Sequence, residues 1–229
     1  MSKRGKTYKQ MLENFDRTNR YTLDEACDLL KNLPARNFEE TVELALKLGI
    51  DPKRSEQAVR GAVTLPQGSG QEKRVAVVAS GDAATAAKDA GADYVGFEEM
   101  IQQIKDGWLD FDALIATPDA MNSLRPLGKV LGPRGLMPNP KTGTLTDDTA
   151  SAVKEAKAGK VEYRSDRGGC VHAPIGKKSF SVEALKENAV AVIEAVRNAR
   201  PSDLKGTYLL SVTISSTMSP GIRIDTQAV

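Results

Sequence analysis

Histidine is almost absent from this chain of 229 residues, since His172 is the only one. One histidine supplies neither a cluster of metal ligands nor a relay of imidazoles, so we expect no metal site. Cysteine is also rare, and Cys27 and Cys170 lack the spacing of a disulfide framework or a zinc site. Two such thiols favour a reducing compartment, and we therefore expect a cytoplasmic protein.

Long apolar runs are missing as well. No segment approaches the length of a membrane span, and the basic start of the chain, MSKRGKTYKQ, is not followed by the apolar stretch of a signal peptide. These absences predict that the protein has no membrane partner.

Glycine motifs that bind phosphate are incomplete. From Gly135 the chain reads GLMPNPKT against GxxxxGK[ST], and Pro140 occupies the place of the second glycine. Proline has no N–H and cannot join a nest of donors around a phosphate. Residues 79–84 hold one glycine where a dinucleotide site needs GxGxxG. We expect no cofactor and no enzymatic activity. The alternatives are a nucleotide-binding α/β enzyme and a thiolate pair of Cys170 and His172.

Acidic residues are missing between residues 120 and 146, where Arg125, Lys129, Arg134 and Lys141 are all cationic. Within this window the run LGKVLGPRGLMPNPKTG, residues 127–143, is so rich in glycine and proline that it predicts a rigid loop with neither helix nor strand. Cations without compensating acids suit a polyanion, whereas an ordinary solvated loop is the alternative.

The two ends of the chain predict an antiparallel sheet with helices. Residues 7–17 read as a basic helix, and the capping box Thr22-Leu23-Asp24-Glu25 opens a second helix that buries Cys27 and ends before Pro34. Alternating apolar residues predict strands at 41–48 and 59–65. They also predict a hairpin of 161–166 with 170–175, which places Arg164 opposite His172. Ser181 caps a long helix that reaches Asn198.

The middle of the chain alternates between strands and helices, which is typical of a parallel α/β sheet. Strands are expected at 75–79, 93–97 and 113–116, and helices at 82–89, 98–106 and 149–158. Glycines at 68–70 and 158–160 mark linkers on both sides. We therefore predict a discontinuous α+β domain, residues 1–67 plus 160–229, interrupted by an inserted α/β Rossmann-like domain, residues 68–159. The inserted block carries a net charge of about −3 and the remainder about +5.

The last predicted strand carries a row of hydroxyls. Tyr208, Leu210, Val212 and Ile214 share one face, and the other face holds Ser211, Thr213, Ser215 and Thr217. Threonine favours pleated surfaces, so strand propensity alone explains such a row. The same row is also suited to hydrogen bonds with RNA phosphates and 2′-hydroxyls.

Several blocks, in chain order, resemble the bacterial type of the large-subunit ribosomal protein one family, the RNA-binding protein of the ribosomal side stalk. They are ARNFEETVE at 35–43, LGIDP at 48–52, GPRGLMPNPK at 132–141, HAPIG at 172–176 and the pair Thr217-Met218. The resemblance implies two domains and binding to the stalk of large-subunit ribosomal RNA. It also implies help in releasing deacylated tRNA from the exit site, repression of translation of the protein's own operon mRNA, and a monomer when off the ribosome.

By resemblance, the strongest RNA contacts are Phe38, Thr41, Glu43, Asp166, His172, Ser211, Thr217 and Met218. Ser219 stands where the family usually has glycine, so a side chain is added at that contact. The salt-dependent attraction to phosphate is expected from Arg36, Lys47, Arg54, Arg60, Arg164 and Arg167. In the second domain, the RNA-facing or hinge loop carries Lys129, Arg134 and Lys141. Taken singly, Phe38 and Met218 are also compatible with core positions, and Glu43 with a solvated strand charge.

Overall fold

The computed structural model describes residues 5–34 and 36–227, and the chain divides into two compact units. The first unit combines both ends of the chain, up to Gly70 and from Val161 onward, and the second spans Gln71–Lys160. The sequence placed the two limits at residues 67/68 and 159/160. Antiparallel and parallel sheets coexist with helices, as the predicted α+β class requires.

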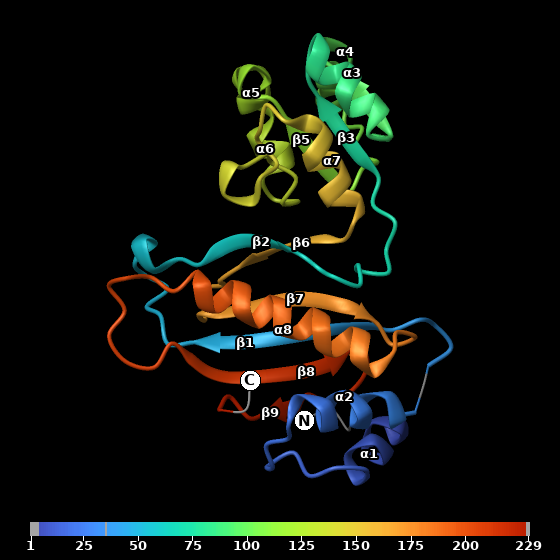
Figure 1. Cartoon of the computed structure of the whole chain (residues 1–229), viewed down its shortest axis with the longest axis vertical. Helices are drawn as coiled ribbons and strands as arrows, with labels where there is room; N and C mark the ends of the chain where they lie inside the picture. The colour runs from blue at the N-terminus through green and yellow to red at the C-terminus, as the bar shows by residue number, and fades with distance from the viewer. Residues whose placement is uncertain (1–4, 35, 228–229) are drawn as a thin grey trace. The chain divides into compact units, whose positions relative to one another are not determined.

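The first unit is built on an antiparallel sheet of four strands in the order β7-β1-β8-β9 (Figure 1). The central strand β1 (Thr41–Leu48) pairs with β7 (Cys170–Lys177) on one side and with β8 (Leu209–Ser216) on the other. The short strand β9 (Ile222–Ile224) pairs with β8. Burial alternates along β1 as the apolar pattern predicted, with every even-numbered residue from 42 to 48 buried.

Three helices complete this unit, namely α1 (Lys6–Glu13), α2 (Leu23–Asn32) and α8 (Val182–Asn198). The predicted capping box of α2 is present in full, and the Ser181 hydroxyl accepts from the Ala184 N–H at 3.1 Å to cap α8. Cys27 is fully buried in the core, as predicted. The prediction that the first helix reaches residue 17 is wrong. The chain turns after Glu13, because the Asp16 carboxylate accepts from the Thr18 N–H at 2.8 Å.

The predicted hairpin of residues 161–175 is formed only at its tip. Strand β6 (Lys160–Arg164) pairs with β2 (Arg60–Thr64) in a separate sheet of two strands, and one antiparallel bridge, Ser165 to Val171, links β6 to β7. Both strands find longer partners elsewhere, since β7 pairs along β1 and the Ser165 N–H donates to the Val59 carbonyl at 2.8 Å. The predicted inward and outward faces of β6 and β7 are confirmed.

The second unit contains a parallel sheet of three strands in the order β4-β3-β5. These strands are β3 (Val75–Val78), β4 (Tyr94–Gly96) and β5 (Ala113–Ala116). The longer helices of this unit alternate with or follow these strands, namely α3 (Asp82–Asp89), α4 (Glu98–Lys105), α5 (Pro118–Leu124) and α7 (Thr149–Lys157). All four residues of β3 are buried, which confirms that both faces of this strand are covered.

The glycine- and proline-rich run of this unit is more ordered than its composition predicts. It contains one turn of α-helix, α6 (Gly128–Leu131), between two 3₁₀ turns at Arg125–Leu127 and Pro140–Thr142. The prediction of a loop without helix is therefore wrong. Proline is tolerated in the first turn of a helix, and Leu127 and Leu131 are buried in the core of the unit. Apolar anchoring thus overrides the helix-breaking composition.

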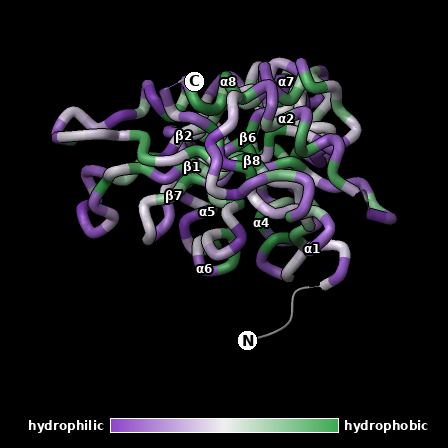
Figure 2. The backbone as a smooth tube through the Cα atoms, turned by 90° about the horizontal axis from the view of Figure 1, so that it is seen from below, coloured by the Kyte–Doolittle hydropathy of each residue, from purple (hydrophilic) through white to green (hydrophobic). Residues whose placement is uncertain are grey.

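Figure 2 shows hydrophilic and hydrophobic residues alternating along the strands and helices, as expected for elements with one buried side. Within residues 5–34 and 36–227, none of the helices has both the length and the apolar character needed to cross a membrane.

Candidate nucleic-acid interface

One face of the four-stranded sheet is open. The side chains between the buried positions of β1, β7, β8 and β9 point the other way, and Glu43, His172, Ser211 and Arg223 among them are exposed. Helices α2 and α8 pack against the opposite face, where the apolar side chains form the core (Figure 1). We call the side facing away from these helices the open face.

The strand register places the polar side chains of the open face in rows. Ala45 pairs with His172 on one side and with Thr213 on the other, and Thr213 pairs with Arg223. In the neighbouring rows, Lys47 pairs with Ser211 and Glu43 with Ser215. The hydroxyls predicted for one side of β8 therefore face the same surface as His172. Ser211 and Thr217 are exposed, and Thr213 and Ser215 are half-buried.

The prediction that Leu210 shares a face with Val212 and Ile214 is wrong, because Leu210 is 48% exposed whereas Val212 and Ile214 are fully buried. The register between β1 and β8 shifts between Lys47 and Leu48, so that Leu48 pairs with Leu209 and Lys47 with Ser211. Leu210 is the extra residue of this bulge and turns outward. The bulge thus adds an apolar side chain beside Ser211.

The open face ends in a turn formed where β8 ends and β1 begins. The Thr41 N–H donates to the Thr217 hydroxyl at 3.1 Å, and the Thr217 N–H donates to the Thr41 carbonyl at 3.0 Å. The Lys177 ammonium donates to the Thr41 hydroxyl at 3.0 Å. Thr41 and Thr217 therefore lie side by side, next to a cation, at one edge of the face.

A buried carboxylate organises this turn from beneath. Glu40 is only 1% exposed, and its Oε2 accepts from the Ser216 hydroxyl at 2.6 Å and from the Met218 N–H at 3.2 Å. Its Oε1 lies 3.8 Å from the Lys178 ammonium. Ser219 also turns back onto the turn, since its hydroxyl accepts from the Ser216 N–H at 2.8 Å. The added side chain at position 219 is thus used within the turn.

Two large apolar side chains of this region are exposed, one shortly before β1 and one in the turn. Phe38 is 52% exposed and Met218 is 46% exposed. Neither is a core residue, so the core interpretation of Phe38 and Met218 is wrong, while their contact with RNA stays a prediction. Beside Phe38 lies a hollow of about 320 Å³ that is also lined by the cations Lys31, Arg36 and Lys178 and by the acids Glu39 and Glu40. Exposed aromatic and thioether groups next to cations are suited to stacking on bases or riboses.

The other end of the face is closed by the loop between β6 and β7. The Asp166 carboxylate accepts from the N–H groups of Cys170 at 2.7 Å and Gly168 at 2.8 Å. These hydrogen bonds, with the charges of His172 and Lys47 nearby, hold the pKa of Asp166 below its usual value. The Lys47 ammonium donates to the Gly168 carbonyl. Asp166 therefore orders the loop beside His172.

Some of the predicted RNA-binding residues lie elsewhere. Arg60 is on β2, where its guanidinium is 3.7 Å from the Glu162 carboxylate, and Arg164 is on the neighbouring β6. Arg54 follows β1 and lies 3.8 Å from Asp51. Arg167 is exposed at the tip of the Asp166 loop. The second unit carries Lys129, Arg134 and Lys141, all exposed. RNA binding stays a prediction for these residues, as it does for those on the open face.

Three further residues of this region were not singled out from the sequence: Glu40, Lys177 and Arg223. Arg223 lies between the buried Ile222 and Ile224, and this alternation over three residues is its only sequence signal. Glu40 and Lys177 take part in the turn through contacts between strands that are distant in the chain. No pattern in the local sequence predicts such contacts.

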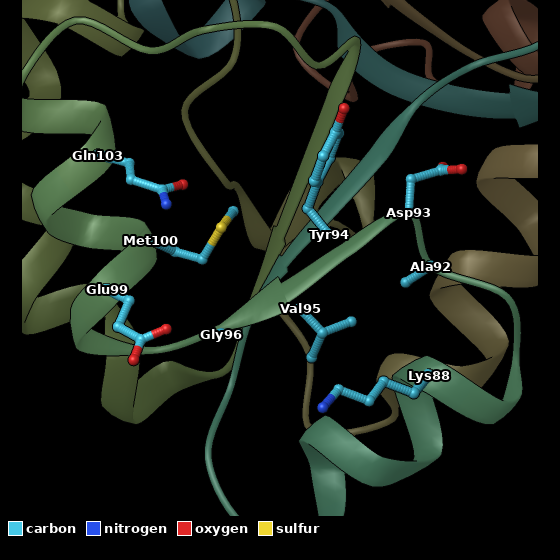
Figure 3. A pocket seen from close by; sticks show the side chains of 9 residues that line it. All are labelled: Lys88, Ala92, Asp93, Tyr94, Val95, Gly96, Glu99, Met100 and Gln103. Carbon is cyan, nitrogen blue, oxygen red and sulfur yellow. The ribbon is translucent and has the colours of Figure 1, made fainter.

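The second unit has a pocket of about 380 Å³ along β4 (Figure 3). Figure 3 shows Tyr94 and Val95 of β4 between Glu99 of α4 and Lys88 of α3. The pocket lies along the edge strand of the sheet, whereas dinucleotides in such sheets bind beyond the carboxyl ends of the strands where the strand order reverses. It therefore does not support the alternative of a nucleotide-dependent enzyme. Among the described residues, no three His, Cys, Asp or Glu side chains gather as metal ligands would.

The fold and the open face define a class: a two-unit α+β protein whose antiparallel sheet presents an uncovered, hydroxyl-rich face. Residues 29–220 match the model of the Ribosomal protein L1p/L10e family. The match covers most of the chain, and the chain belongs to this family. The predicted family is thereby confirmed. Membership supports a structural, non-enzymatic role in the ribosome and binding to ribosomal RNA in general.

Proposed function

We propose that the open face and its turn bind the stalk region of large-subunit ribosomal RNA. The observation that carries this proposal is the meeting of Thr41, Glu43, His172, Ser211 and Thr217 on one uncovered face, although they come from three strands that are distant in the chain. RNA binding agrees with membership of a ribosomal protein family.

The chemistry of the face fits structured RNA. Hydroxyls both donate and accept hydrogen bonds, so the row on β8 is able to pair with ribose 2′-hydroxyls and with phosphate oxygens. Met218 and Phe38 offer apolar surfaces for a ribose or base. Lys177 adds a donor at the Thr41 end of the face and His172 adds one in the row of Ala45, and Asp166 holds the loop near His172 in place. Because 2′-hydroxyls distinguish RNA from DNA, this set of groups favours RNA.

We further propose the finer roles that the sequence resemblance implies. In this view the protein is of the bacterial type, is cytoplasmic and ribosome-associated, and is a monomer when off the ribosome. It helps to release deacylated tRNA from the exit site and represses its own operon mRNA through a similar RNA fold. The inserted unit is a Rossmann-like α/β domain whose Lys129, Arg134 and Lys141 face RNA or the hinge.

Truncation of the exposed apolar groups tests the proposal. Binding of a folded stalk RNA is measured for the wild type, Phe38→Ala and Met218→Ala. We expect each variant to lose about 1 to 3 kcal/mol of binding free energy, the usual contribution of a stacked base. Gln102→Ala is the control, because Gln102 is also exposed but lies on α4 of the second unit, outside the loop that carries Lys129, Arg134 and Lys141. A duplex DNA of equal length should bind far more weakly than the stalk RNA.

The alternative hypothesis is that the protein is a general nucleic-acid adaptor without preference for structured RNA. It predicts equal affinity for the stalk RNA and the duplex DNA at the same salt concentration. Equal affinities, or wild-type binding by both truncated variants, would refute the proposed function.

A further inference from the structure

The open face continues beyond β9 to the segment that precedes α2. The Tyr21 N–H donates to the Arg223 carbonyl at 3.0 Å, and the Asp225 N–H donates to the Tyr21 carbonyl at 2.9 Å. Tyr21 therefore pairs in parallel with Ile224 and adds one more rung to the sheet. Tyr21 packs against the core and Ile224 is buried, so the residues preceding them, Arg20 and Arg223, face the other way.

These two arginines line a pocket of about 320 Å³ together with hydroxyl side chains of β8. Its polar lining consists of Arg20, Arg223, Ser211, Thr213 and Thr226. Thr213 is the cross-strand partner of Arg223, and it lies in the same row as His172. The pocket is thus the direct continuation of the open face across β8 and β9.

The charge of this pocket is not compensated by the described part of the chain. None of the described residues that line it is acidic. Within residues 5–34 and 36–227, neither Arg20 nor Arg223 lies within ion-pair distance of a carboxylate, although both are exposed. The carboxylate of the adjacent Asp225 accepts instead from the Gln227 N–H at 3.1 Å. Two adjacent unpaired guanidinium groups repel each other unless an anion lies between them.

We propose that Arg20 and Arg223 bind a backbone phosphate of the RNA, with the hydroxyls of Ser211 and Thr213 as further donors. Guanidinium groups present paired N–H donors that match phosphate oxygens, and two of them clamp one phosphate from both sides. The inference rests on the proposed function, because Ser211 is common to the pocket and to the predicted RNA contacts. It extends the path of the RNA from the turn at Thr217 across β8 and β9 toward the start of α2.

The salt dependence of binding tests the pocket. The affinity of the full chain for a folded stalk RNA is measured at several potassium chloride concentrations for the wild type and for the double variant R20Q/R223Q. Loss of one phosphate contact should reduce the slope of log affinity against log salt by about 0.7 to 0.9. Because both side chains are exposed, the melting temperature should stay unchanged. The double variant R20K/R223K keeps the charge and should keep the wild-type slope.

The matched control is Arg17→Gln, because Arg17 is exposed on the same segment and does not line the pocket. Its slope should equal that of the wild type. A wild-type slope for R20Q/R223Q, or an equal reduction of the slope for R17Q, would overturn the proposal that this pocket binds a phosphate. The proposed function would still stand if Met218→Ala weakens binding. Failure of the wild type to bind the stalk RNA overturns both.

Discussion

Removal of the Glu40 carboxylate is the sharpest test of how the recognition turn is held. In the variant Glu40→Ala, the Ser216 hydroxyl and the Met218 N–H lose their acceptor, and the Lys178 ammonium loses a neighbouring charge. Both side chains are largely removed from water, since Glu40 is 1% exposed and the Lys178 side chain 11%. Breaking a buried ion pair by removing one partner costs about 3 to 5 kcal/mol, so we expect a loss of this size in the free energy of unfolding.

Two substitutions calibrate this expectation. Glu40→Gln also removes the charge beside Lys178, but it keeps an oxygen that accepts from the Ser216 hydroxyl, so it should cost about 1 kcal/mol less than Glu40→Ala. Glu39→Gln changes the adjacent, exposed carboxylate and should leave the stability within about 0.5 kcal/mol. Glu39 and Glu40 both directly precede β1, so comparing variants at the two positions distinguishes the effect of burial from the effect of position in the chain.

Urea denaturation measures these losses. Circular dichroism follows the whole chain, and the fluorescence of Trp108, the only tryptophan, follows the second unit. We expect Glu40→Ala to shift the transition of the first unit to lower urea and to weaken RNA binding, because the turn at 216–219 loosens. Glu40→Gln should recover most of that binding. Wild-type stability of Glu40→Ala, or equal losses for Glu39→Gln, would show that the buried carboxylate does not hold the turn.

Two further predictions concern the first unit. Asn188 is fully buried. Its side-chain oxygen accepts a hydrogen bond from the Gln67 N–H at 3.0 Å, and its NH₂ group donates to the Gly68 carbonyl at 3.0 Å and the Ile175 carbonyl at 2.7 Å. Asn188→Ala should therefore lower the free energy of unfolding, measured by urea denaturation, by about 2 to 4 kcal/mol. Asn198→Ala, at an exposed position, is the control. A smaller loss for Asn188→Ala than for Asn198→Ala would show that the buried amide does not stabilise the unit. Burial raises the pKa of the Cys27 thiol to about 11, so the unfolded chain ionises first as the pH rises. The contribution of this thiol to the free energy of unfolding is therefore fully present below about pH 8.5. It should fall by about 1.4 kcal/mol per pH unit between there and the pKa of the folded state, and the variant Cys27→Ala should not show this decrease.

The amino-acid pattern predicted the parts of the fold that are set by local periodicity. The alternation of β1 and the caps of α2 and α8 are properties of short segments, and each was found where it was expected. The pattern could not predict which strands pair. Residues 161–166 and 170–175 read as a hairpin, yet β6 pairs with β2 because the competing partners lie far away in the chain.

The candidate site also combines features that the local sequence predicted with features that depend on strand pairing. The hydroxyls of β8 were visible from alternation, but the bulge that turns Leu210 outward arises from pairing with β1. The turn depends on Glu40, which reaches Ser216 and Met218 across the sheet. Arg20 and Arg223 meet only because Tyr21 pairs with β9. Contacts of this kind follow from tertiary packing and have no signature in the local sequence.

Ultraviolet crosslinking of the protein to a folded stalk RNA, with the crosslinked residues identified by mass spectrometry, tests the central claim most directly. The account predicts crosslinks at Phe38, His172 and Met218, and in the segments that carry Ser211 and Arg223. Crosslinks confined to the outer side of α8, for example around Lys186 and Glu194, with none on the open face, would contradict it.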